Sequence, residues 1–285
     1  MRLARSIPEL DRHRSDLRAG AVGARTAFVP TMGALHAGHL SLVSLARRLA
    51  DVVVLSIFVN PLQFGPTEDY ADYPRPLADD LAKAEAAGVD IVFTPSVKEI
   101  YPPGRQISVN AGAIGSILEG ASRPGHFDGV LTVVLKLLNI VAPDMAVFGR
   151  KDAQQLACIR RMVLDFDLDV DIVGAPIIRE PDGLAMSSRN RFLSAAERTS
   201  ALVLNASLRA AELEATPAEA LAAAEKVLTK AVTAGEIVLD YVKVVNATTM
   251  APVLEDHPGT ALALVAARVG TTRLIDNTEL IFASD

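Results

Sequence analysis

Along the first two thirds of the chain, short apolar runs alternate with longer stretches in which apolar residues recur at helical spacing. The clearest run, residues 51–59, is a nearly unbroken series of valine, leucine and isoleucine, which is typical of a parallel strand buried on both faces. Strands are expected at residues 26–30, 51–59, 90–94, 145–149 and 169–173. Because helical stretches separate these runs, the pattern predicts βαβ units and one parallel sheet.

After residue 178 the character of the chain changes. Alanine-rich amphipathic stretches predict helices at residues 194–213 and 217–234, and strand-like runs follow at 238–245, 261–267 and 272–275. A surface helix at 5–19, a strand-like stretch at 101–110 and a short helix at 112–120 are also expected. The expected fold class is α/β, with a Rossmann-like parallel sheet domain over residues 1–178 and a smaller C-terminal α+β domain over residues 179–285.

A distinctive loop, Pro30-Thr31-Met32-Gly33-Ala34-Leu35-His36-Ala37-Gly38-His39, joins the first of these expected strands to the next helix. That helix presents unpaired backbone N–H groups and the positive end of its dipole to the loop, which favours an anion such as phosphate. Gly33 and Gly38 allow close backbone approach to a ligand, and His36 and His39 can donate ring N–H bonds. The His-x-Gly-His sequence resembles the signature of the nucleotidyltransferase superfamily that includes class I aminoacyl-tRNA synthetases.

A zinc site and helix capping are the two alternatives to phosphate binding for the histidine pair. The zincin motif places two histidines four residues apart on one continuous helix, with a glutamate between them. His36 and His39 are three residues apart, Gly38 lies between them and no glutamate does, so a zinc site is disfavoured. Capping of the helix by the two histidines remains an open alternative.

The common nucleotide-binding motifs are absent from the sequence. The Gly120-x-x-x-x-Gly125 spacing matches the start of a Walker A loop, but His126-Phe127 follows where Lys and Ser or Thr are required, and no GxGxxG sequence is present. Phosphate contacts are therefore expected from the histidine loop and from separate cations. The candidates for these cations are Lys151 and the run Met186-Ser187-Ser188-Arg189; for this run taken alone, a solvated loop without a ligand remains the alternative.

Composition and charge narrow the class of protein. The chain has 285 residues, half of them hydrophobic, which is enough for a large core. Its net charge of −6 argues against nucleic acid or an anionic membrane as a partner. The single cysteine, Cys158, is expected to be buried and cannot form a disulfide within the chain. No apolar window approaches the ~20 residues of a membrane span, and the N-terminus has no signal-like apolar segment, so a soluble cytoplasmic protein is expected.

Six sequence blocks, taken together and in this order, resemble the pantothenate synthetase family. They are Pro30-Thr31-Met32-Gly33-Ala34-Leu35-His36-x-Gly38-His39, Phe58-Val59-Asn60-Pro61-x-Gln63-Phe64, Tyr73-Pro74-Arg75, Arg123-Pro124-x-His126-Phe127, Phe148-Gly149-x-Lys151-Asp152-x-Gln154-Gln155 and Met186-Ser187-Ser188-Arg189-Asn190. The resemblance implies an ATP-dependent ligase, acting as a homodimer, that condenses (R)-pantoate with β-alanine through a pantoyl-adenylate and releases AMP and pyrophosphate. Arg150 and Ala153 depart from the commonest pattern of the family.

The resemblance also implies which residues bind ATP. They are Pro30, Thr31, Met32, His36, Gly38, His39, Gly149, Lys151, Asp152, Ile178, Met186, Ser187, Ser188 and Arg189. Among them, the groups expected to act on the phosphates during catalysis are His36, His39, Lys151, Ser187, Ser188 and Arg189. Asp79 is the expected partner of Mg²⁺, because magnesium sites use one or two carboxylates and keep waters. A carboxylate that merely stabilises the first turn of a helix explains Asp79 nearly as well.

The pantoate site is expected in the first of the two domains, over residues 1–178. Gln63 and Gln155 suit the hydroxyls and carboxylate of pantoate, and Pro30 and Met32 can pack on its gem-dimethyl group. For each glutamine, an ordinary role in a turn remains the alternative.

Two further features are expected around the site. Glu119, Arg123 and His126 are expected to form a supporting network. The loop 186–190, hinged at Gly183 and joined to the second domain, is expected to act as a lid that excludes water from the labile adenylate.

Three other functions compete with this interpretation of the sequence. A different His-x-Gly-His nucleotidyltransferase, one that transfers AMP or CMP to a phosphate acceptor, would need further cations where this chain offers Gln63 and Gln155. A tRNA synthetase is disfavoured because the chain lacks a basic anticodon-binding region. A nucleotide-binding regulator without catalysis would require the phosphate ligands to be missing, and the sequence retains them.

Overall fold

The computed structural model describes residues 1–19, 23–65, 70–254 and 257–283. The chain divides into two units, one comprising Met1–Arg150 and Gln154–Pro176 and the other comprising Lys151–Ala153 and Ile177–Asp285. The roles expected for the domains 1–178 and 179–285, as an ATP- and pantoate-binding domain and a lid, stay predictions. Within the described residues, no helix is both long and apolar enough to span a membrane.

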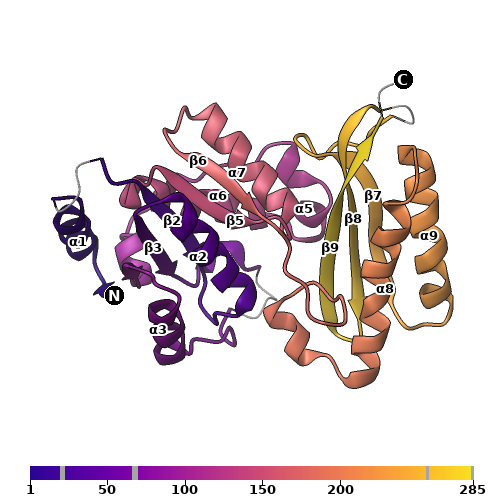
Figure 1. The fold of residues 1–285 in the computed structure, drawn as a ribbon, viewed down its shortest axis with the longest axis horizontal. Helices are drawn as coiled ribbons and strands as arrows, with labels where there is room; N and C mark the ends of the chain where they lie inside the picture. Colours follow the sequence, from indigo (N-terminus) through magenta and orange to yellow (C-terminus); the bar gives the residue numbers. More distant parts are fainter. Residues whose placement is uncertain (20–22, 66–69, 255–256, 284–285) are drawn as a thin grey trace. The chain divides into compact units, whose positions relative to one another are not determined.

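The first unit is built on a parallel six-stranded sheet in the order β1-β4-β3-β2-β5-β6. Its strands are β1 (Arg2–Ala4), β2 (Thr26–Thr31), β3 (Val52–Ile57), β4 (Ile91–Phe93), β5 (Met145–Gly149) and β6 (Asp171–Ala175). Strands β2, β3, β5 and β6 are labelled in Figure 1. The chain adds β3 and β4 on one side of β2 and later adds β5 and β6 on the other side. The expected parallel α/β sheet is confirmed, and its strand order reverses between β2 and β5.

Helices cover both faces of this sheet. The helices of this part of the chain are α1 (Ile7–Ala19), α2 (Ala37–Leu49), α3 (Leu77–Ala86), α4 (Val97–Ile100), α5 (Glu119–Ser122), α6 (His126–Val141) and α7 (Ala153–Asp165), with short 3₁₀ turns η1 (Pro61–Gln63) and η2 (Ile114–Ser116). On β3, Val54 packs in a core with Val134 of α6, whereas its neighbour Leu55 packs in a second core with Val43 of α2. Successive strand residues point to opposite faces, so an unbroken apolar run is what a doubly covered strand requires.

The second unit combines a three-stranded antiparallel sheet with two helices. The strands are β7 (Val238–Asn246), β8 (Gly259–Val269) and β9 (Thr272–Phe282), in the order β7-β8-β9. The helices α8 (Ala195–Ala211) and α9 (Pro217–Thr233) lie beside each other along this sheet (Figure 1), and the turn η3 (Ser188–Phe192) precedes them. Leu204 and Leu208 of α8 share a core with Leu228 of α9 and Val265 of β8. The expected α+β arrangement is confirmed.

Several element boundaries differ from the expectations. The short edge strand β1 was missed because three residues show no measurable period, and residues 101–110, all described, form no strand. Strand β9 continues to Phe282, well past the expected end at residue 275. The prediction ended too early because polar residues in the second half of the strand interrupt the apolar pattern.

Cys158 lies in α7 and is buried in the first unit, as expected. Burial raises the pKa of its thiol to about 12, so the group stays protonated at neutral pH. It acts as a small apolar side chain in the core.

Candidate active site

The histidine loop leaves β2 at the point where the strand order of the sheet reverses. Strands β3, β2 and β5 are neighbours and run parallel, so their carboxyl ends, at Ile57, Thr31 and Gly149, lie along one edge. In open parallel sheets, ligands bind outside this edge at the reversal of strand order. The loop after β2, Gln63 after β3 and Gly149 at the end of β5 therefore occupy the expected ligand-binding edge of the first unit.

The start of the loop is held by Thr31. Its hydroxyl donates to the carbonyl of Ser56 on β3 at 2.7 Å and accepts the backbone N–H of Gly33 at 3.2 Å. Gly33 adopts φ +85°, a left-handed conformation that side-chain-bearing residues rarely adopt. The Thr31 side chain thus shapes the loop, while Pro30 and Met32 on either side of it are only half-buried.

Helix α3 clamps the middle of the loop through two charged side chains. The carboxylate of Asp80, which is 1% exposed, accepts the N–H of Ala34 at 2.8 Å and of Leu35 at 2.7 Å. One turn on, Lys83 donates from Nζ to the carbonyl of Leu35 at 2.8 Å. A Cβ on Gly33 would lie 2.9 Å from Oδ2 of Asp80, so the carboxylate sits directly beneath the turn.

Asp80 was missed in the sequence analysis, which favoured its neighbour Asp79. The available signal was helical spacing, because Asp80 lies four residues before the buried Ala84 and therefore shares its face. Asp79 is exposed in the first turn of α3. Within the described residues, no group of three or more His, Cys, Asp or Glu side chains is arranged to hold a metal ion.

The two histidines cap the N-terminus of α2. Nδ1 of His36, the N-cap residue, accepts the N–H of Gly38 at 3.1 Å, and Nδ1 of His39 accepts the N–H of His36 at 3.4 Å. Their rings lie 4.0 Å apart, tilted by 30°. The capping interpretation is therefore confirmed, and it does not compete with phosphate binding, because capping uses only one nitrogen of each ring.

Capping also determines the tautomer of His39. Burial, and secondarily the neighbouring His36, lower the pKa of His39 to about 3, so this ring is neutral at physiological pH. A neutral imidazole whose Nδ1 accepts a hydrogen bond carries its proton on Nε2. His39 is thus a fixed, uncharged N–H donor at the positive end of a helix, and such donors stabilise developing negative charge.

Gln63 lies in η1 and is positioned by Asn60. The buried amide of Asn60 donates to Oε1 of Gln63 and to the carbonyl of Gly129, both at 3.1 Å. Oδ1 of Asn60 accepts the hydroxyl of Tyr101 at 2.8 Å and the N–H of Leu62 at 3.2 Å. Burial raises the pKa of Tyr101, which keeps its phenol protonated as a donor. Because Oε1 of Gln63 is already bonded, its amide NH₂ is the group it offers to a ligand.

The backbone of Gln63 is held from α6 and the preceding turn. His126 donates from Nδ1 to the Gln63 carbonyl at 2.8 Å, and Arg123 donates to the same carbonyl at 3.3 Å. Arg123 also lies 3.0 Å from Nε2 of His126. Two of the three residues expected to form a supporting network thus converge on Gln63.

The adjacent glutamines of α7 differ in environment. Gln154 is buried: its amide donates to the carbonyls of Ile114 and Ile117, both at 2.7 Å, and its Oε1 accepts the N–H of Glu119 at 3.0 Å. Gln155, the expected pantoate ligand, is half-buried. Gln154 therefore supports the 114–119 segment, and Glu119 joins this bond through its backbone.

In the second unit, the Ile178 and Met186 segments form a short hairpin. The N–H of Met186 donates to the carbonyl of Ile178 at 2.9 Å, and Arg179 pairs with Ala185 as an antiparallel bridge. Gly183, at the tip, adopts φ +96°. Ser187 directly follows this hairpin and is the N-cap residue of η3.

Ser187 and Arg189 are linked in this turn. The hydroxyl of Ser187 caps η3 by accepting the N–H of Arg189 at 3.2 Å. The Arg189 side chain is exposed, and Ser187 and Ser188 are half-buried. Asn190 is buried and donates to Oε1 of Glu180 at 2.6 Å, which ties the turn to the hairpin.

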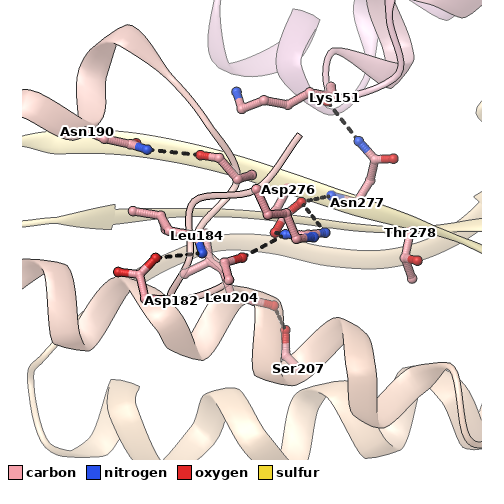
Figure 2. A network of polar contacts seen from close by, with 12 residues as sticks. Lys151, Asp182, Leu184, Asn190, Leu204, Ser207, Asp276, Asn277 and Thr278 are labelled. Carbon is pink, nitrogen blue, oxygen red and sulfur yellow. Dashed lines mark hydrogen bonds and ion pairs between the residues drawn. The ribbon is translucent and has the colours of Figure 1, made fainter. Parts of the chain in front are cut away.

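Lys151 and Asp152 also belong to the second unit, although they follow directly after β5 in sequence. The carbonyl of Lys151 accepts the side-chain amide of Asn277 at 2.8 Å (Figure 2). The structure thus groups the expected ATP ligands in two sets. The first unit holds Pro30, Thr31, Met32, His36, Gly38, His39 and Gly149, and the second holds Lys151, Asp152, Ile178, Met186, Ser187, Ser188 and Arg189.

The sequence matches the family described as Pantoate-beta-alanine ligase over residues 2–279. Pantothenate synthetase of Acidothermus cellulolyticus is 53% identical over 282 residues, covering 96% of this chain and 90% of the relative. Pantothenate synthetase of Thermobifida fusca is 54% identical over 265 residues, covering 90% of each.

Solved structures give the same result. The crystal structure of pantothenate synthetase from Thermus thermophilus matches with a TM-score of 0.88 and 47% identity, covering 98% of this chain and 99% of that chain. Pantoate-beta-alanine ligase from Francisella tularensis, crystallised with "Beta-gamma ATP" and β-alanine, matches with a TM-score of 0.79 and 37% identity over 98% of this chain and 97% of its own. Because the similarity spans nearly the whole chain and not the His-x-Gly-His loop alone, this chain belongs to the pantoate–β-alanine ligase family.

Proposed function

We propose that the carboxyl edge of β2, β3 and β5, together with Lys151 and the 178–189 segment, carries out the ATP-dependent condensation of pantoate with β-alanine. The observation that carries this assignment is the hydrogen bond from the backbone N–H of His36 to Nδ1 of His39. With Nδ1 bonded to the N–H of His36, the neutral ring donates from Nε2 at the N-terminus of α2, at the reversal of strand order.

The reaction proceeds in two steps through a pantoyl-adenylate. A pantoate carboxylate oxygen attacks the α-phosphorus of ATP, and the bond to the β-phosphate breaks to release pyrophosphate. The amine of β-alanine then attacks the acyl carbon, loses a proton and displaces AMP. The first step brings two anions together, and each step releases an anion. The protein therefore contributes positioning of the substrates and stabilisation of negative charge.

The phosphate contacts come from six side chains and one helix end. His36 and His39 donate from the N-terminus of α2, where the helix dipole adds to the attraction. Lys151 and Arg189 neutralise the charge that grows on pyrophosphate, and the hydroxyls of Ser187 and Ser188 donate to its oxygens. Gly149, Asp152, Ile178 and Met186 contact the nucleoside, and Pro30, Thr31, Met32 and Gly38 line the loop beside it.

Pantoate binds through neutral groups in the first unit. Gln63 donates its amide NH₂ to the substrate, because Asn60 already bonds its oxygen. Gln155 supplies a second amide, and Pro30 and Met32 provide apolar contact for the gem-dimethyl group. The Asn60, Arg123 and His126 contacts hold Gln63 in place.

Mg²⁺ is the expected metal, bound with ATP. An exposed single carboxylate such as Asp79 fits a magnesium site, because this ion keeps several waters and uses one or two protein carboxylates with the substrate phosphates. When bound, Mg²⁺ screens the phosphate charge. A homodimeric state rests on the resemblance to the family, and a cytoplasmic location is supported by the single unpaired cysteine.

The test is AMP formation from ATP and Mg²⁺, with pantoate and β-alanine supplied separately and together. We expect sustained AMP release only with both substrates, and exchange of labelled pyrophosphate into ATP that needs pantoate alone. Exchange that required β-alanine would contradict the adenylate intermediate. AMP release independent of both substrates would contradict the assignment of the site.

A further inference from the structure

Strand β9 carries two consecutive polar residues that are almost completely buried. Asp276 is 4% exposed and Asn277 is 5% exposed, and they pair with Val265 and Leu264 of β8. Because neighbouring strand residues point to opposite faces, one hydrophobic position would be expected in such a pair. Burying a polar side chain is unfavourable unless it forms hydrogen bonds, so both residues require partners within the protein.

Asn277 binds the segment that carries Lys151. Its Nδ2 donates to the backbone carbonyl of Lys151 at 2.8 Å, across 126 residues of sequence (Figure 2). This bond fixes the main chain at Lys151. It does not involve the ammonium group, which lies at the end of the flexible lysine side chain. Fixing the main chain reduces the number of positions from which the ammonium group can reach a phosphate.

Asp276 binds the start of the hairpin that leads to Ser187. Its carboxylate receives two bonds from the guanidinium of Arg179, at 2.6 and 3.1 Å, and the backbone N–H of Asn277 at 2.8 Å. Arg179 also donates to the carbonyl of Gly183 at the hairpin tip, at 3.2 Å. A bidentate guanidinium–carboxylate pair fixes direction as well as distance, so it sets the orientation of the hairpin.

We propose that Asp276 and Asn277 are positioning residues for ATP: one strand holds both segments of the second unit that carry its cations, Lys151 through Asn277 and the 187–189 run through Asp276. The inference rests on the proposed role of Lys151 and Arg189 in binding phosphates. Neither Asp276 nor Asn277 touches substrate in this proposal; each acts through the segment that it holds.

The test uses Asn277→Ala, with Thr278→Ala as the matched control. Thr278 is the next residue of β9, and its hydroxyl bonds to Glu212 instead of the Lys151 segment. In the pantoate-dependent exchange reaction, we expect Asn277→Ala to raise the KM for ATP about three- to tenfold, the weight of one hydrogen bond, with the KM for pantoate unchanged. Thr278→Ala should change neither constant. Equal effects on both KM values, or none, would overturn the proposal.

A double-mutant cycle separates positioning from general destabilisation. In a Lys151→Ala background, Asn277→Ala should add no further change to the ATP constants, because the group that it positions is gone. Fully additive effects would contradict action through Lys151. If Lys151→Ala by itself left the ATP constants unchanged, the proposed function of Lys151 would fail first, and this inference with it.

A near-isosteric variant separates the loss of the hydrogen-bond donor from the loss of side-chain volume. Asn277→Asp keeps the volume but replaces the donor by a carboxylate that faces the Lys151 carbonyl. Because a buried carboxylate that faces a carbonyl costs stability, we expect a lower melting temperature and, at temperatures where the variant is folded, the same selective rise in the KM for ATP. A folded Asn277→Asp enzyme with wild-type ATP constants would overturn the proposal even if Asn277→Ala did not fold.

Discussion

Asp80 lies beneath Gly33, and the same carboxylate that accepts the N–H groups of the next two residues would be 2.9 Å from a Cβ on this glycine. The turn that begins the histidine loop and the helix that supports it are therefore fitted to each other. The geometry at His36 and His39 depends on this fit, because the supported residues directly precede the cap of α2.

We expect Gly33→Ala to impair both stability and adenylation. The substitution combines a left-handed φ of +85° with contacts of 2.9 Å to Asp80 and Ile57. Gly88→Ala is the matched control, because Gly88 has φ +82° but no atom within 4 Å of its added Cβ. Each should lose about 1–2 kcal/mol of unfolding free energy for the conformation, and Gly33→Ala more.

Denaturant unfolding and the exchange rate measure the difference between the two glycine variants. Only Gly33→Ala should reduce the exchange rate. If both variants lost the same stability and kept full activity, the close approach of Asp80 to the loop would not matter for function.

Asp80→Asn should lower the free energy of unfolding, whereas Asp79→Asn should change the Mg²⁺ requirement. An Asn amide presents an NH₂ to one of the two N–H donors that Asp80 now accepts, so we expect a loss of about 1–3 kcal/mol of unfolding free energy. Asp79 is exposed, so Asp79→Asn should leave stability unchanged and raise the Mg²⁺ concentration needed for half-maximal exchange. Titrating Mg²⁺ in both variants, with their unfolding curves, checks this; a normal Mg²⁺ requirement in Asp79→Asn would remove Asp79 as the metal ligand.

His39→Asn and His39→Gln separate capping from phosphate binding. An Asn oxygen can accept near the position of Nδ1, and a Gln amide can donate near the position of Nε2. We therefore expect His39→Asn to stay as stable as the wild type but to lose about 10²–10³-fold in adenylation, the usual effect of one lost oxyanion donor. His39→Gln should keep more activity and lose some stability. Rates that fell equally in both would contradict the assignment of Nε2 as the donor.

Stability should fall on acidification because of His39. Its pKa is about 3 in the folded protein, below the ordinary 6.5, so the unfolded chain binds a proton that the folded chain does not. The contribution is fully present above pH 6.5 and is lost progressively as the pH falls toward 3. Urea unfolding at pH 7.5 and 5.0 should show a larger loss for the wild type than for His39→Asn, and equal losses would contradict a neutral buried ring.

The main elements of the first unit follow from local pattern alone. The run Val52–Ile57 is apolar at every position but one, which only a strand covered on both faces accounts for, and the helical period after His39 predicts α2. Such periods arise from local chain geometry, so they can be recognised without the rest of the protein. The parallel sheet, the second α+β unit and the position of the histidine loop at a strand end were all predicted in this way.

Tertiary structure decided which polar residues have which partners. The sequence shows Asp79 and Asp80 side by side, and only the contact with the loop after β2 identifies Asp80 as the supporting carboxylate. Polar residues in β9 obscured the second half of that strand, because Asp276 and Asn277 are buried by partners 97 and 126 residues away. A hydrogen bond between distant segments leaves no periodic trace in the sequence, whereas burial of an apolar face does. The sequence therefore determined the sheet and the loop of this ligase, and the fold determined what holds them in place.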